Sequence, residues 1–244
     1  MMLADARARL FFSFYLKAPP RALLRFLIAL LAILPLVSQA RSQGAPDWSL
    51  QLFDPTRLCQ RDCAFSLYAG RYLTSEMTNI FGIDTFEPPN RWRYGDSGLI
   101  AATVGRPLVG IGNLARAEVE LGLGKRFGDL TAMEGWGAIY FRWLWFPWND
   151  WVRTSIAAST GLSYTPTIDQ IERIRVDNGG RGSRLLHFLS PEITFGLPQK
   201  PDLDLFIRYH HRSGGRNYVI GKSELFNNAA GGAQYLVGGV RFIY

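Results

Sequence analysis

Short segments in which apolar and polar residues alternate recur along the chain, and they limit the fold more than any other feature of the sequence. In the stretch ARAEVELGLG, residues 115–124, the odd-numbered positions are apolar, and charged residues or glycine stand between them. A side-chain period of two is that of a β-strand with one apolar and one polar face. The sequence therefore predicts an all-β protein of eight strands, at residues 64–73, 98–110, 115–124, 135–146, 151–164, 185–197, 203–212 and 233–244.

The segments between the expected strands alternate in length. Two short ones contain proline and aspartate and are typical of tight turns, and longer polar segments follow the other strands. Strands of about ten residues with short turns at one end and long loops at the other are typical of small outer-membrane barrels. We therefore expect an eight-stranded antiparallel transmembrane β-barrel, with periplasmic turns at 146–150 and 198–202 and extracellular loops at 74–97, 125–134, 165–184 and 214–232.

Periodicity alone also allows a soluble exported β-domain that buries its apolar face. Two features favour the membrane. The chain ends in an alternating strand with the aromatic terminus Phe242-Ile243-Tyr244, as bacterial outer-membrane barrels usually do. Tryptophans gather near the expected strand ends, as in the girdles at membrane interfaces. These tryptophans are Trp136, Trp143, Trp145, Trp148 and Trp151.

The chain begins with a basic segment and an apolar run, the order found in a secretory signal peptide. The apolar run, Phe26–Val37, is shorter than the roughly 20 residues that a spanning helix needs. Small residues follow it up to Ala40, where we expect cleavage. The unusually long basic segment leaves a membrane anchor or a mis-assigned start as the alternatives. The expected organisation is a signal peptide at 1–40, an N-terminal periplasmic segment at 41–62 and an outer-membrane barrel at 63–244.

Charge and cysteine content exclude several classes of function. Without the first forty residues the formal net charge falls from +7 to about +3, which together with export argues against nucleic-acid binding. Cys59 and Cys63 are the only cysteines, and in an exported protein we expect a local disulfide between them rather than a metal pair. With three histidines in the whole chain, no zinc motif can be written, and we expect no metal site.

Two of the three histidines stand side by side at the end of the seventh expected strand, in the string IRYHHRSGG, residues 207–215. His210 has the parity of Asp204 and Arg208 and is expected to face the lumen. His211 and Ser213 have the parity of the apolar residues. They are therefore expected next to each other on the outer wall, near the headgroup level of the outer leaflet.

The string His211-Arg212-Ser213, on the penultimate strand of an eight-stranded barrel, resembles the His-x-Ser motif of the lipid A 3-O-deacylase family (PagL type). That family hydrolyses an ester-linked acyl chain of lipid A with a His/Ser/Glu triad on the outer barrel surface, and it needs no cofactor. The resemblance covers roughly the last forty residues and the strand count. It implies a carboxylic ester hydrolase whose partner is lipid A of lipopolysaccharide, with Ser213 as nucleophile and His211 as general base. The backbone N–H groups of residues 213–215 would form the oxyanion hole.

The third member of such a triad has two candidates. Glu224 is the only acidic residue after Ser213, and its spacing from His211 is close to that of the family. The family's glutamate stands about ten residues from the chain end, however, and Gln234 occupies that place here. A glutamine can orient a histidine, but it stabilises imidazolium less well than a carboxylate does.

The alternative function is that of a non-catalytic outer-membrane barrel with a structural or surface-interaction role, in which His211 and Ser213 only decorate the rim. His187 is interpreted as an interfacial residue, and oligomeric state is left open. A basic cluster, Arg208, Arg212, Arg216 and Lys222, suits lipid phosphates under either function. Charged residues expected to pair inside the barrel are Arg116, Glu118, Glu120, Arg142, Arg153 and Glu192.

Overall fold

The structure is a computed structural model that describes residues 45–57, 59, 62–82, 85–168, 182–214, 224–229 and 231–244. The expected signal peptide lies outside these residues. Helical structure in the described part is confined to three short elements, α2 (Met77–Ile80), η2 (Pro89–Arg91) and η3 (Glu224–Phe226). None of the described helices is long and apolar enough to cross a membrane.

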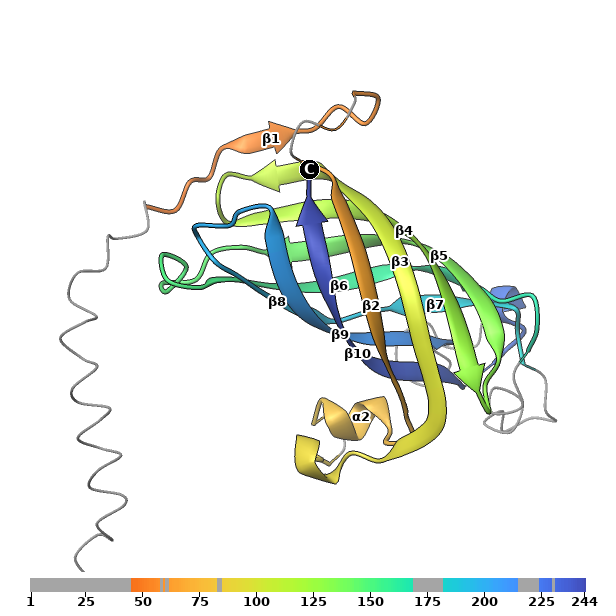
Figure 1. Ribbon diagram of the computed structural model, residues 1–244. Coiled ribbons are helices and arrows are strands. Elements are labelled where there is room, and N and C mark those ends of the chain that lie inside the picture. Colours follow the sequence, from red (N-terminus) through yellow and green to blue (C-terminus); the bar gives the residue numbers. More distant parts are fainter. Residues whose placement is uncertain are drawn as a thin grey trace, which may run out of the picture. The chain divides into compact units, whose positions relative to one another are not determined.

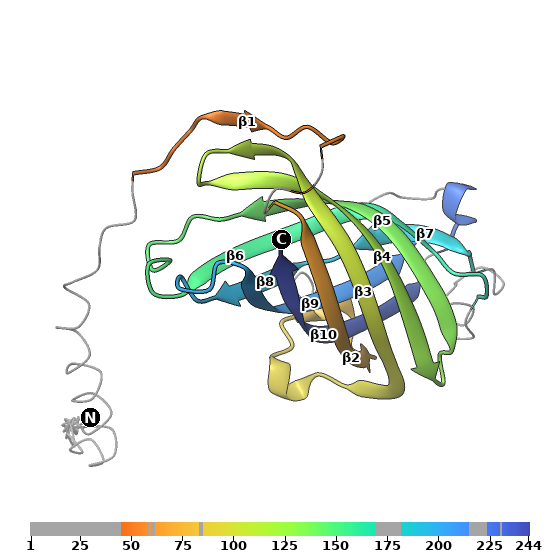
Figure 2. The same ribbon diagram turned by 45° about the horizontal axis from the view of Figure 1, so that its top comes forward.

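The strands form one antiparallel sheet that closes on itself (Figures 1 and 2). The last strand pairs with its predecessor and with β2, and this second pairing closes the ring. Two short strands, β7 and β8, together occupy one of the eight positions and are separated by Ser190 and Pro191. The prediction of an eight-stranded barrel is confirmed. The strands are β1 (Leu50–Leu52), β2 (Ala64–Leu73), β3 (Tyr94–Ile111), β4 (Ala115–Gly128), β5 (Ala132–Trp143), β6 (Arg153–Tyr164), β7 (Leu185–Leu189), β8 (Glu192–Gly196), β9 (Leu203–Ser213) and β10 (Gly232–Ile243).

The barrel buries charged side chains in its lumen, beside a cluster that is largely aromatic, and exposes apolar side chains on its outer wall. Arg126, Arg142 and Arg208 are at most 2% exposed, whereas Leu121 and Leu123 of β4 are 60% and 67% exposed. A soluble barrel would place these groups the other way round, because burying charge is costly and burying apolar surface is favourable. This distribution rules out the soluble alternative and is that of a transmembrane barrel. The outer wall includes Leu67, Ile100, Val104, Ile139, Phe141, Ile156, Leu162, Phe195, Leu205, Ile207 and Phe242.

Charged side chains of opposite sign fill the lumen in pairs. Arg208 lies 2.8 Å from Glu120 (Nη2 to Oε2) and also contacts Glu192. Arg142 donates to Glu118 at 2.9 Å and to Glu192 at 2.7 Å. Eight strands leave an interior that side chains can fill, and the expected internal pairing is confirmed. Two further pairs are Arg116 with Glu118 and, at the turn end, Arg153 with Asp204.

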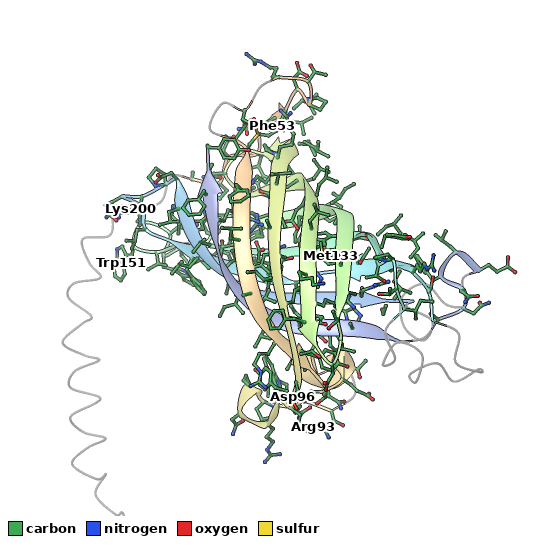
Figure 3. The ribbon with its side chains drawn as sticks, turned by 45° about the vertical axis from the view of Figure 1, so that its right-hand side comes forward. Phe53, Arg93, Asp96, Met133, Trp151 and Lys200 are labelled. Carbon is green, nitrogen blue, oxygen red and sulfur yellow. A yellow bond between two sulfur atoms is a disulfide. The ribbon has the colours of Figure 1, made fainter. Side chains whose placement is uncertain are left out.

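The tryptophans divide between the membrane interface and the lumen. Trp143, Trp148 and Trp151 are 40–49% exposed at the turn end, as a girdle requires, and Figure 3 shows Trp151 and Lys200 at this end. The girdle assignment of Trp136 is wrong. Its ring is 5% exposed and stacks on Phe188 inside the barrel, because it has the opposite strand parity from Trp143.

Gly122 leaves the space that the Trp136 ring occupies, since the two residues are cross-strand partners and a Cβ at position 122 would overlap the indole. We expect Gly122→Ala to lower the free energy of unfolding by about 1–3 kcal/mol, because the buried ring has to shift. Gly135→Ala is the control, since its Cβ would meet Leu123 at an ordinary 3.4 Å. Urea unfolding in lipid vesicles measures both, and equal stabilities would contradict this account of the packing.

The N-terminal segment is fixed at the turn end of the barrel. Its strand β1 extends the sheet beyond the ring by pairing with the end of β3. Arg106 of β3 donates hydrogen bonds to the carbonyl oxygens of Asp54 and Pro55. The predicted disulfide between Cys59 and Cys63 is confirmed, and it lies immediately before β2.

Candidate active site

The two neighbouring histidines of β9 face opposite sides of the barrel wall, as their parity predicts. His210 is fully buried in the lumen, where its ring accepts or donates hydrogen bonds with Tyr68 at 3.0 Å and Glu134 at 3.2 Å. It belongs to the internal polar network and is unavailable to an external substrate. His211 is on the outer face of the same strand.

His211 and Ser213 are joined by a hydrogen bond on this outer face. The His211 Nε2 atom lies 2.9 Å from the Ser213 Oγ atom, which is the geometry of a general base beside a hydroxyl nucleophile. Strand β9 positions both groups, because residues two apart project from the same face. His211 is only 7% exposed, so its ring is held in packed surroundings while Ser213 is half-buried.

Strand register determines the neighbours of this pair. Ser213 is opposite His187 of β7 on one side and Gly232 of β10 on the other. The His187 Nε2 atom is 2.9 Å from the hydroxyl of Thr160. Strand parity predicts that His187 faces outward, but it does not predict that this residue lies beside Ser213. The outer wall therefore carries a second, hydrogen-bonded histidine next to the candidate nucleophile.

A segment that we term the strap, residues 74–82 and 85–93 between β2 and β3, packs against the outer wall of the barrel (Figure 1). Its helix α2 contributes Ile80 to an apolar cluster with Leu73 and Tyr209. The Phe81 ring meets the Tyr209 ring edge-on at 5.4 Å, and Tyr209 in turn stacks on His211 at 5.7 Å. The strap thus supports the imidazole through one aromatic side chain.

The two candidates for the third member occupy different surroundings. Gln234 is the direct cross-strand neighbour of His211, is 2% exposed and donates to the strap at the Ser75 carbonyl oxygen. Glu224 is exposed at the start of η3. Both Glu224 and His211 lie in the described part of the chain, and no hydrogen bond joins their side chains there.

The structure changes two other expectations about the site, one on the oxyanion hole and one on the basic cluster. The N–H of Gly214 donates to the Gly231 carbonyl oxygen at 3.4 Å, so it is not free for an oxyanion, and Gly215 lies outside the described residues. The assignment of Arg208 and Arg212 to lipid phosphates is wrong. Both are fully buried, and Arg212 binds Thr165 and two loop carbonyl oxygens from inside the barrel. Arg216 and Lys222 lie outside the described residues.

Within the described ranges there is no group of three or more histidine, cysteine, aspartate or glutamate side chains that could hold a metal ion. The outer-wall site brings together a serine hydroxyl and two imidazoles, those of Ser213, His211 and His187. That set suits acyl transfer, in which the hydroxyl attacks and the imidazole carries the proton.

Comparison with known proteins finds similarity among solved structures. No family model matches the chain, and no curated protein sequence is significantly similar to it. The crystal structure of Neisserial surface protein A aligns with a TM-score of 0.40 and 13% sequence identity, covering 77% of this chain and 100% of that one. The assignment of the fold accordingly rests on the strand pairing and on the inverted burial described above.

Proposed function

We propose that the protein is a bacterial outer-membrane esterase that removes an ester-linked acyl chain from lipid A. The observation that carries the proposal is the 2.9 Å hydrogen bond between His211 Nε2 and Ser213 Oγ on the membrane-facing wall. A nucleophile and base at that place can reach only a substrate that lies in the membrane. The resemblance of the His-x-Ser string to lipid A deacylases points to the same chemistry.

The position of the pair supports a substrate in the outer leaflet. Ser213 is the last residue of β9, at the end of the barrel that carries the longer loops. In outer-membrane barrels the longer loops are extracellular. The outer leaflet of such a membrane is rich in lipopolysaccharide, whose ester bonds lie near the headgroup level. The pair would therefore meet an ester carbonyl at the depth where the acyl chains join the sugar.

The proposed reaction has two steps. Ser213 Oγ attacks the ester carbonyl carbon while His211 Nε2 takes the hydroxyl proton, and the same proton passes to the departing sugar alcohol. Water then attacks the acyl-serine with His211 again as base, which releases a fatty acid and restores the hydroxyl. Lipid A from cells that produce the protein tests this by mass spectrometry, through the loss of one acyl chain. Unchanged lipid A would favour the non-catalytic barrel.

The group that orients His211 can be identified with two variants. The cross-strand register favours Gln234, and we expect Gln234→Ala to slow deacylation by about 10-fold to 100-fold, because His211 loses its polar neighbour on β10. We expect Glu224→Gln, which removes only a carboxylate charge, to stay within about twofold of wild type if Gln234 has that role. The rate of acyl release from purified lipid A in detergent is the measurement. A large loss in Glu224→Gln alone would assign the third position to the carboxylate instead.

A further inference from the structure

An apolar hollow lies on the outer wall at the turn end of the barrel, far from the candidate active site. Its volume is about 240 Å³, and it spans the outward faces of β8 and β9 and the residue before β6. Among its lining residues, Lys200 is the one that carries a charge. We term this hollow the turn-end groove; it is lined by Val152, Phe195, Gly196, Leu197, Lys200, Leu203 and Leu205.

Strand pairing explains why these residues meet. Phe195 and Leu205 are cross-strand partners, so their side chains lie next to each other on the lipid side of the wall. The turn between β8 and β9 is fixed from the barrel side, because Arg153 donates to the carbonyl oxygens of Lys200 and Pro201 at 3.1 Å. This fixes the backbone of Lys200, which is one of the residues that line the groove.

We propose that the turn-end groove binds one acyl chain of a phospholipid, whose phosphate pairs with the Lys200 ammonium. The apolar lining belongs to the wall that faces the hydrocarbon, where the available molecules are lipids. Trp151, adjacent in sequence to Val152, is 43% exposed at the same end, as expected at headgroup level (Figure 3). The exposed Lys200 is thus at the level of the membrane interface, next to an apolar lining that suits an acyl chain.

The groove is a separate site from the Ser213 pair. Leu205 and Ser213 are eight residues apart on β9, a separation of about 26 Å along an extended strand. The two sites thus belong to opposite leaflets. A phospholipid in the groove would bind in the leaflet on the turn side, whether or not the outer-wall pair hydrolyses an ester.

Native mass spectrometry of the full chain, after equilibration with equal amounts of phosphatidylglycerol and phosphatidylcholine, tests the proposal. We expect wild type to retain one phospholipid, with about fivefold preference for the anionic phosphatidylglycerol, as one cation near the headgroups provides. Lys200→Gln should remove this preference while keeping the bound lipid. Leu205→Trp should fill the groove and lower retention of both lipids.

Matched controls come from β4, on another part of the wall. Lys125→Gln removes another exposed lysine, and Leu121→Trp adds the same bulk at an exposed leucine. Both should behave as wild type. The proposal is overturned if wild type retains the two lipids equally, if Leu205→Trp retains as much lipid as wild type, or if Lys125→Gln removes the preference as Lys200→Gln does.

Discussion

Replacement of Ser213 by alanine is expected to abolish acyl-chain release from lipid A, with a loss of about a thousandfold or more. The reason is that the alanine variant has no oxygen nucleophile within reach of the His211 imidazole, which lies 2.9 Å from the serine hydroxyl in the wild type. The measurement is the rate of fatty-acid release from purified lipid A, together with mass spectrometry of lipid A from producing cells.

The double variant Ser213→Ala/His211→Asn gives the sharper test of a shared mechanism. A nucleophile and its base act as a unit, so the double variant should be no slower than either single one. Ser159→Ala, a buried serine of β6 that faces the lumen, is the control and should retain wild-type activity. Heat-dependent mobility in SDS gels verifies that each variant is folded. Full activity in folded Ser213→Ala would refute the proposed nucleophile.

Loss of Arg208 is expected to have the largest effect on stability. Its guanidinium is fully buried and binds Glu120 and Glu192. Arg208→Met would leave the Glu120 carboxylate buried, with the Trp136 N–H, at 3.1 Å, as its one remaining hydrogen-bond donor among the described residues. Removing one partner from a buried ion pair costs about 3–5 kcal/mol, and we expect a loss of that size in the free energy of unfolding.

Urea unfolding in lipid vesicles measures this loss, and two further variants show its cause. Arg116→Met removes a lumen arginine whose side chain is 30% exposed, and it should cost less than about 1 kcal/mol. Arg208→Met/Glu120→Met removes both charges, so it should recover much of the lost stability. If Arg208→Met and Arg116→Met had the same free energy of unfolding, the buried ion pairs of Arg208 would not be a major source of the barrel's stability.

The strands could be predicted because a barrel wall repeats one local rule. Each side chain faces either lipid or lumen, so alternation alone located all eight positions, with ends within a few residues of those observed. Alternation did not predict two features of the structure, because both lie outside the regular strands. The strap with α2 lies outside the strands, and the interruption at Pro191 arises because proline has no N–H for the ladder.

The wall that each candidate residue faces was determined by the sequence itself. Side-chain direction depends only on position along one strand, and this separates His211 and Ser213 on the lipid side from His210 in the lumen. The neighbours of these residues were decided by the tertiary structure alone. Alternation fixes which wall a residue faces, but a shift of the pairing by two residues would keep the same alternation, so it does not fix which residues of neighbouring strands meet. The pairing in the folded barrel places His187 beside Ser213 and Gln234 beside His211.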